Sequence, residues 1–346
     1  MKVVHLMVLD KFIPPFIKFI NDHFNPGEHL FIIFDKPKTD YGMDIKVKNV
    51  FWVDSKWKIF DLLKFLYSAN KIIIHGLWVE KLNQLLFIQP WLLKKCYWVM
   101  WGGDFYFPQK QSIFKKFVIK NIGYLITYMP KQIEYVREHY KAKGQYIDCL
   151  FYPDGIYQKK LTELLKNSGI RTNLAEKKIR ILVGNSATET NRHEIVFYKV
   201  KQYIDTRDIP LSSIEIIVPL SYGDIYYREK ILKIGFELFG DSFNPLINFL
   251  KYEEYLKILL TIDIAIFYHN RQQGLGNLIQ LLGMGKKVYL NKETPQWSLF
   301  ESLGVRVFDF DTEFNLEIEE IPENSKIIEK EFTVQKVIEG WKRILE

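Results

Sequence analysis

The residues of this chain best suited to chemistry lie at positions 269–277, directly after an apolar segment at 262–267 that is typical of a buried strand. Apolar residues at helical spacing begin again at Leu278. A strand that turns through glycines into a helix presents free backbone N–H groups at the positive end of the helix dipole, where phosphate binds well. The stretch supplies hydrogen-bond donors and backbone freedom, in the order His269, Asn270, Arg271, Gln272, Gln273, Gly274, Leu275, Gly276 and Asn277. We therefore predict an anionic-ligand site here; the alternative is a strand–helix connection that is merely polar.

A second polar loop follows the apolar segment at 179–183. Its glycine can turn sharply and its side chains can donate to phosphate or ribose: Gly184, Asn185, Ser186, Thr188, Asn191 and Arg192. A helix N-cap at Thr190 or Asn191 explains part of this loop. Tyr222, which follows the apolar segment at 214–219, is a weaker contributor. Because the loops leave neighbouring strand ends, they predict a nucleoside diphosphate site in the second half of the chain.

Short apolar segments alternate with amphipathic helical patterns along the whole chain, which predicts an α/β fold with a parallel sheet in each half. The predicted strands of the first half are residues 3–9, 29–34, 47–53, 71–75, 96–100, 124–129 and 145–150. Those of the second half are residues 179–183, 214–219, 262–267, 287–290 and 305–308. We expect a first domain at 1–155, a polar linker at 156–178, a second domain at 179–330 and a final helix at 331–346 that packs back on the first domain. Two such domains predict a ligand cleft between them, at the carboxyl ends of their strands.

Composition excludes several other classes of protein. Two cysteines, Cys96 and Cys149, in 346 residues argue against a disulfide framework and fit a reducing cytoplasm. No apolar stretch approaches the roughly 20 residues of a membrane span. Part of the net charge of +7 lies at 105–145, which holds eight basic residues against Glu134 and Glu138. No nucleic-acid-binding motif accompanies these charges, so we expect no nucleic acid partner.

The sequence predicts neither a cofactor nor a metal. A dinucleotide fingerprint requires G-x-G-x-x-G directly after a strand, and Ile279 stands where a third glycine would follow Gly274 and Gly276. Asp309 and Asp311 have the spacing of a metal-binding D-x-D triplet. An acidic segment at 312–323 follows them, and we interpret the pair as solvated acids because isolated D-x-D spacing carries little information.

Four segments together resemble glycosyltransferase family 56: HGLW at 75–78, WVMWGGDFY at 98–106, VGNSATETNRH at 183–193 and HNRQQGLGN at 269–277. The similarity runs from about residue 3 to residue 310. It implies a GT-B fold of two Rossmann-like domains, with a nucleotide-sugar donor held mainly by the C-terminal domain. It also implies transfer of 4-acetamido-4,6-dideoxygalactose (Fuc4NAc) from dTDP to an undecaprenyl-diphosphate-linked saccharide, in polysaccharide synthesis of the common-antigen or O-antigen type. Such an enzyme would be cytoplasmic and peripheral on the inner face of the bacterial inner membrane.

Glycosyl transfer requires neutralisation of the leaving diphosphate, which the two loops can supply without a metal, and usually removal of a proton from the acceptor hydroxyl. For the base we predict Asp104, which follows a buried-type strand and lies among aromatic residues that would raise its pKa. The alternative for Asp104 is a turn-stabilising role after two glycines. His75, at another strand end, is the competing base, and its alternative is a hydrogen-bonded structural histidine.

A lipid-linked acceptor would give the basic segment a use. The helical pattern at 112–121 carries apolar residues on one side with Lys115, Lys116 and Lys120 flanking them, which predicts a face for the acceptor and an anionic membrane surface. A core-packed helix with outward lysines is the alternative. Two other functions stay open: a nucleotide-sugar 2-epimerase, which needs no acceptor, and a non-catalytic nucleotide-sugar binding protein.

Overall fold

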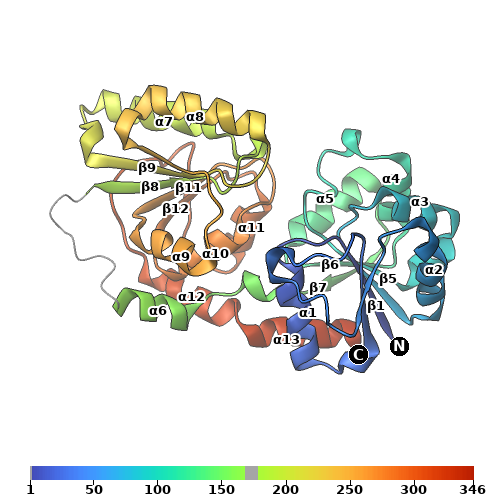
Figure 1. The fold of residues 1–346 in the computed structure, drawn as a ribbon. Coiled ribbons are helices and arrows are strands. Elements are labelled where there is room, and N and C mark those ends of the chain that lie inside the picture. Colours follow the sequence, from blue (N-terminus) through green and yellow to red (C-terminus); the bar gives the residue numbers. More distant parts are fainter. Residues whose placement is uncertain (1, 168–177) are drawn as a thin grey trace. The chain divides into compact units, whose positions relative to one another are not determined.

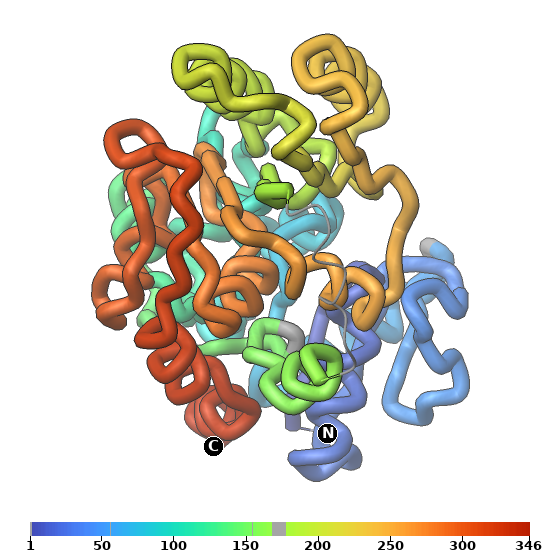
Figure 2. The backbone as a smooth tube through the Cα atoms, turned by 90° about the vertical axis from the view of Figure 1, so that its left-hand side faces the viewer, coloured from blue at the N-terminus to red at the C-terminus, as the bar shows by residue number. Residues whose placement is uncertain are grey.

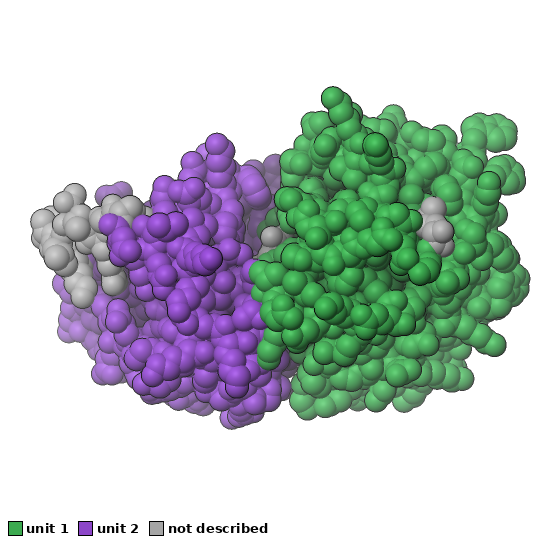
Figure 3. All heavy atoms as spheres, turned by 90° about the horizontal axis from the view of Figure 1, so that it is seen from below, with its two compact units in different colours: residues 1–155, 334–346 green, residues 156–333 purple. Residues whose placement is uncertain are grey.

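The computed structural model describes residues 2–167 and 178–346. The chain divides into two compact units, one formed by Met1–Gly155 with Val334–Glu346 and the other by Ile156–Thr333 (Figure 3). We call them unit 1 and unit 2. Each contains one sheet, and the strand pairs of both sheets are parallel within the described residues.

The sheet of unit 1 has seven strands in the order β3-β2-β1-β4-β5-β6-β7. The strands are β1 (Val3–Met7), β2 (His29–Ile33), β3 (Val50–Trp52), β4 (Lys71–His75), β5 (Cys96–Val99), β6 (Tyr124–Thr127) and β7 (Gln145–Asp148). Every residue of β1 and β2 is buried, because helices cover both faces of the sheet.

The helices of unit 1 are α1 (Ile13–His23), α2 (Ile59–Ser68), α3 (Glu80–Ile88), α4 (Ile113–Asn121), α5 (Pro130–Tyr140) and α13 (Val334–Leu345). Apolar residues of α2, α3, α4 and α5 share one core cluster with one face of the sheet. On the other face α13 lies beside α1, with the rings of Phe16 and Trp341 5.0 Å apart (Figures 1 and 2). The Trp341 indole donates to the Phe151 carbonyl at 2.8 Å, which anchors the last helix of the chain to unit 1.

The sheet of unit 2 has six strands in the order β10-β9-β8-β11-β12-β13. The strands are β8 (Ile179–Val183), β9 (Ile214–Pro219), β10 (Phe243–Leu246), β11 (Ile264–Phe267), β12 (Lys287–Leu290) and β13 (Phe308–Asp309). The helices are α6 (Lys159–Asn167), α7 (His193–Thr206), α8 (Ile225–Phe239), α9 (Tyr252–Thr261), α10 (Leu275–Gly283), α11 (Pro295–Ser302) and α12 (Pro322–Glu331). Helices α7 and α8 cover one face, and α9, α10 and α12 lie on the other (Figure 1).

The predicted class, two parallel-sheet α/β halves, is confirmed, and the differences lie in particular elements. Edge strand β10 was not predicted, because its sequence FNPL contains a proline and is short. The predicted strand at 305–308 pairs only at Phe308–Asp309, and that at 47–53 only at Val50–Trp52. Helix α6 occupies part of the segment assigned to a linker, whose residues 168–177 lie outside the described part of the chain. None of the helices in the described residues is both long and apolar enough to span a bilayer.

Candidate functional site

The two polar loops of unit 2 leave adjacent strands at the carboxyl edge of the sheet. Strand β8 pairs with β11, while the chain continues from β8 to β9 on one side and from β11 to β12 on the other. The strand order therefore reverses between β8 and β11. In open parallel sheets, ligands bind at the carboxyl ends of the strands at such a switch point.

The two polar loops meet at the start of α10. Its N-cap, Gly274, has φ +69°, and no side chain caps this end of the helix. A Cβ at Gly274 would lie 3.2 Å from His269 Cε1 and 3.3 Å from Asn185 Oδ1, so the two loops meet at this glycine. The backbone N–H groups of the first turn point out of the helix start at the positive end of its dipole. Gly276 in that turn is exposed.

Gln273 ties the two loops together. Its amide nitrogen lies within hydrogen-bonding distance of Asn185 Oδ1 (2.9 Å), Ser186 Oγ (3.0 Å) and Thr188 Oγ1 (3.1 Å). Its amide oxygen accepts a hydrogen bond from Thr190 Oγ1 at 2.6 Å. A buried amide with this many partners fixes the loop geometry, because leaving any of the groups unpaired would be costly.

Asn191 is the second fixed point. Its side-chain oxygen accepts from the Asn185 backbone N–H (2.9 Å) and lies 2.9 Å from His269 Nε2, which therefore carries the proton. Burial is the main cause that lowers the pKa of His269 to about 3, so this histidine is neutral at physiological pH. Gly184, with φ +68°, is required here because a Cβ would lie 2.7 Å from Asn191 Oδ1 and 2.6 Å from His193 Nε2.

The structure divides the predicted donor-binding residues into a buried scaffold and an accessible rim. Buried members are Gly184, Asn185, Ser186, Asn191, His269, Gln273 and Leu275. Exposed or half-exposed members are Thr188, Arg192, Tyr222, Asn270, Arg271, Gln272, Gly274, Gly276 and Asn277. Seven of the sixteen predicted residues are therefore buried and hold the loops, and the other nine form the rim that a ligand can reach.

Several rim side chains already have partners in unit 2. The Tyr222 hydroxyl accepts from Asn185 Nδ2 at 2.8 Å, and Asn277 Nδ2 donates to the Tyr255 hydroxyl at 2.9 Å. The Arg192 guanidinium lies 4.7 Å from the centre of the Tyr268 ring. Sequence reasoning missed Tyr255, which lies on the neighbouring helix α9 and has no motif to mark it.

Replacing Gln273 with alanine is expected to lower the stability of unit 2 and to weaken nucleotide binding together. The change leaves the partners of a buried amide without hydrogen bonds, which costs about 2–4 kcal/mol of unfolding free energy. Urea unfolding monitors stability, and calorimetric titration with dTDP monitors binding. Asn270→Ala, on the rim of the same loop, is the matched control that should leave stability unchanged. An unchanged midpoint for Gln273→Ala would contradict the scaffold role.

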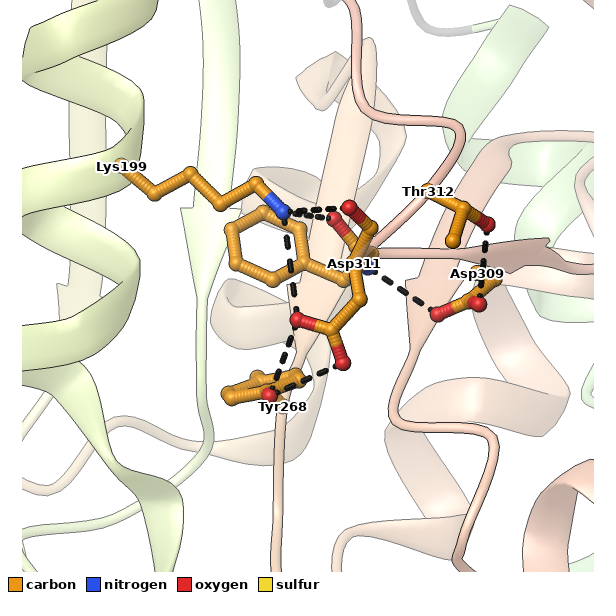
Figure 4. A network of polar contacts seen from close by, with 6 residues as sticks. Lys199, Tyr268, Asp309, Asp311 and Thr312 are labelled. Atoms are coloured by element: carbon orange, nitrogen blue, oxygen red, sulfur yellow. Dashed lines mark hydrogen bonds and ion pairs between the residues drawn. The ribbon is translucent and has the colours of Figure 1, made fainter.

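The D-x-D pair belongs to a structural network (Figure 4). Asp309 is buried and binds its own turn, with Oδ1 accepting from Asp311 N (3.0 Å) and Oδ2 from Thr312 Oγ1 (2.9 Å). The Asp311 carboxylate accepts from the Tyr268 hydroxyl at 2.9 Å and lies 3.9 Å from Lys199 Nζ. The interpretation as solvated acids is therefore wrong for Asp309. Within the described residues, no group of three or more His, Cys, Asp or Glu side chains is placed to hold a metal ion.

Asp104 is fully buried, and its carboxylate has three donors from unit 1. Oδ2 accepts from Leu77 N (3.0 Å) and from the Trp98 indole (2.7 Å), and Oδ1 accepts from Trp101 N (3.2 Å). Burial raises the pKa of Asp104, although these hydrogen bonds oppose the shift. This geometry is that of the turn-stabilising alternative, at the turn that contains Gly102 and Gly103.

His75 is also buried, within a row of hydrogen-bonded rings. His75 Nε2 lies 3.2 Å from His5 Nδ1, His5 Nε2 lies 3.0 Å from His29 Nδ1, and His75 Nδ1 lies 2.6 Å from the Tyr152 hydroxyl. Burial lowers the pKa of His75 to about 3. Because both ring nitrogens are engaged, the structure favours the structural alternative for this histidine.

Asp10 is a more accessible carboxylate of unit 1 than Asp104. It follows β1, which with β4 forms the switch point of this sheet, and it is half-buried. Burial raises the pKa of Asp10 to about 6, while the Phe12 N–H, which donates to Oδ1 at 2.8 Å, opposes the shift. The sequence could have indicated Asp10, because it is an acid directly after the predicted strand at 3–9. That segment was considered only as a strand.

Aromatic rings surround this edge of unit 1. Ring centres of Phe12 and Trp101 lie 5.4 Å apart, those of Trp101 and Tyr152 5.2 Å, and those of Trp78 and Trp101 6.4 Å. The Trp78 side chain is exposed. Aromatic faces beside a partly exposed carboxylate suit a sugar or an apolar chain with a hydroxyl to deprotonate.

Helix α4 packs inward with its phenylalanines. Phe87 of α3 contacts Phe114 and Phe117, at centroid distances of 5.2 and 4.8 Å, and Val118 is buried. Lys116 and Lys120 are exposed, whereas Lys115 is half-buried and its charge partly offsets the rise in the pKa of Asp104 that burial causes. Helix α4 therefore packs against α3 through its phenylalanines, and Ile113 is the apolar residue that it exposes most.

Several solved structures share this architecture over nearly the whole chain. The N-terminal domain of Candida albicans trehalose-6-phosphate phosphatase matches with 12% identity and a TM-score of 0.69, over 99% of this chain and 96% of that chain. Trehalose 6-phosphate synthase from Burkholderia multivorans matches with 7% identity and a TM-score of 0.66, over 99% and 96%. Anabaena HepE in complex with UDP and glucose matches with 12% identity and a TM-score of 0.65, over 100% and 99%.

These likenesses establish the fold as GT-B, with two parallel-sheet domains. The sequence profile of the 4-alpha-L-fucosyltransferases, glycosyl transferase group 56, matches residues 64–346, which include α10 and the loops at its start. The chain belongs to this family and is a glycosyltransferase.

Proposed function

We propose that the enzyme transfers a Fuc4NAc-like deoxyamino sugar from a dTDP-sugar to an undecaprenyl-diphosphate-linked saccharide in bacterial surface polysaccharide synthesis. The enzyme would act in the cytoplasm, at the inner face of the inner membrane. The observation that carries the donor side is the uncapped start of α10 beside the Gln273 scaffold, at the switch point of unit 2. The resemblance to family 56 supports the choice of sugar and acceptor.

In the proposed reaction, the acceptor hydroxyl oxygen bonds to the anomeric carbon while the bond from that carbon to the diphosphate breaks. The electron pair leaves with the nucleoside diphosphate. Its charge is received by the N–H groups of the first turn of α10 and by Arg271, which lies on the rim. The hydroxyl proton passes to the Asp10 carboxylate, whose pKa of about 6 makes it a usable base at neutral pH.

A transfer assay tests the proposal directly. The full chain is incubated with dTDP-Fuc4NAc and an undecaprenyl-diphosphate-linked oligosaccharide, and the lipid product is identified by mass spectrometry. Product formed from the dTDP-sugar, and not from UDP- or GDP-sugars, is the expected result. Conversion of the donor to an epimer without acceptor would identify an epimerase instead. Transfer from a UDP-sugar alone would keep the enzyme class and contradict the donor.

Replacing Arg271 with alanine is expected to weaken binding of dTDP by on the order of 10–100-fold, because a charge-assisted hydrogen bond to phosphate is lost. Calorimetric titration measures the change. The melting temperature should stay within the error of wild type, since the guanidinium lies on the rim. Lys160→Ala, an exposed cation on α6, is the control for loss of charge alone. Equal loss of affinity in both variants would contradict a specific contact at Arg271.

A further inference from the structure

We propose that unit 1 binds anionic lipid bilayers through a surface formed by α2, α3, α4 and the short helix Pro90–Lys95 between α3 and β5. We call it the aromatic–lysine surface, and its apolar members are Phe60, Tyr67, Ile88, Trp91 and Ile113. The inference rests on the proposed function in one respect: a lipid-linked acceptor explains why such an enzyme would need a membrane. The surface itself is argued from the structure.

The apolar members are strongly exposed. Their side chains are between 52% and 70% exposed, although they are large enough to be core residues. Trp57, one turn before Phe60, is 82% exposed. Single exposed apolar residues are ordinary, but a patch of large ones marks a surface that meets another apolar phase.

Contacts link the segments that carry these residues. Phe60, Lys64 and Tyr67 share a face of α2, since they are four and three residues apart. The Trp91 indole donates to the Tyr67 hydroxyl at 3.2 Å, and that hydroxyl donates to Gln89 Oε1 at 2.9 Å. Gln89 directly follows α3, and Phe87 at the end of α3 packs against α4. The three helices lie on the same side of the unit 1 sheet (Figure 1).

The positive charge of residues 57–121 favours an anionic partner. Residues 57–121 contain ten lysines and three acidic residues, a net charge of +7 that equals the net charge of the whole chain. Lys64, Lys81, Lys116 and Lys120 are exposed on the helices that carry the apolar side chains, where Asp61 and Glu80 are the exposed acids; Asp104 is buried. Tryptophan and tyrosine favour the headgroup region, and lysines attract anionic lipid from the same depth.

This charge also argues against pairing of two copies through the surface. Two such faces would bring their lysines together, whereas an anionic headgroup layer complements them. The apolar members then enter the boundary between headgroups and acyl chains, as in other interfacial helices. The surface is wider than the single helix predicted from sequence, and Lys115 is not part of it.

The test is co-flotation of the full chain with vesicles, without any donor or acceptor. Vesicles of phosphatidylcholine containing roughly a third phosphatidylglycerol should bind the protein, and vesicles of phosphatidylcholine alone should bind it at least tenfold more weakly. Lys81→Gln/Lys116→Gln/Lys120→Gln should reduce partitioning by on the order of 100-fold, from about 1 kcal/mol per lysine. Ile88→Ser/Trp91→Ser/Ile113→Ser should reduce it by at least tenfold. Higher salt should weaken binding of wild type.

Matched controls are taken from unit 2. Lys160→Gln/Lys166→Gln/Lys233→Gln removes the same charge, and Ile195→Ser/Tyr198→Ser/Phe236→Ser removes exposed apolar side chains. Both should bind vesicles as wild type does. Equal loss in the controls, no preference for anionic vesicles, or a dimer in sedimentation that the apolar variant separates would each overturn the proposal.

Circular dichroism verifies that all variants are folded. Because no nucleotide is present, vesicle binding can succeed or fail independently of the proposed dTDP-sugar. A variant that loses vesicle binding but retains turnover on a detergent-solubilised acceptor would confirm that the surface acts in membrane attachment and not in chemistry.

Discussion

Replacing Asp10 with asparagine is expected to lower kcat by on the order of 10²–10⁴-fold, the usual contribution of a general base. Asparagine retains an oxygen for the Phe12 N–H, so the local turn should persist. Burial raises the pKa of Asp10 above its value in the unfolded chain, so keeping this carboxylate ionised at neutral pH lowers the stability of the folded state. The melting temperature of Asp10→Asn should therefore equal or exceed that of wild type. Steady-state kinetics and calorimetry on the same preparation measure both effects.

The pH profile gives this prediction a second readout. The base acts as a carboxylate, so wild-type kcat/KM should fall as the pH drops below about 6, the pKa of Asp10 in the folded protein. The residual activity of Asp10→Asn should lack this limb. If the variant keeps wild-type kcat, the acceptor proton goes elsewhere, for example to a leaving phosphate oxygen, and the assignment of Asp10 is contradicted.

Replacing Asp104 with alanine is expected to destabilise unit 1 by about 3–5 kcal/mol, because three N–H donors lose their acceptor in a buried turn. Urea unfolding should show an earlier transition for unit 1. Asp104→Asn, which keeps the shape but presents an N–H₂ group to one set of donors, should cost about 1–3 kcal/mol.

The asparagine variant separates structure from catalysis. Where Asp104→Asn remains folded, its kcat should lie within about tenfold of wild type, whereas loss of a base costs far more. If Asp104→Asn lost turnover by about a thousandfold at unchanged stability, Asp104 would be identified as the base after all. The comparison of Asp10→Asn with Asp104→Asn, two carboxyl-to-amide changes in one unit, supplies the matched control for each.

The sequence predicted the parallel sheets and the two polar loops that follow β8 and β11 because both depend on local patterns. Apolar segments such as 71–75 indicate strands buried on both faces, and the glycines at 274 and 276 mark the helix start that the structure shows. Strand β10 escaped because one proline and four residues carry no strand signal. Helix α12 escaped because its sequence PENSKIIEKE is mainly polar.

The direction of side chains could not be predicted from the sequence. Asp104 and Asp10 both follow strands of unit 1, yet one meets three buried donors and the other stays partly accessible. Likewise Gln273 and Asn270 lie three positions apart in one polar run, and the structure places the first in the scaffold and the second on the rim. Such distinctions depend on contacts between residues far apart in the chain, which composition and spacing do not encode.

Hydrogen exchange of the full chain with and without dTDP tests whether a nucleoside diphosphate binds at the start of α10 in unit 2. We predict slower exchange in peptides covering 184–193 and 270–278, because the phosphates engage the N–H groups of the helix start and hold both loops. Peptides covering 57–121 should exchange as before. Protection confined to unit 1, or no protection with dTDP, UDP, GDP or CDP, would exclude a nucleotide site at the start of α10.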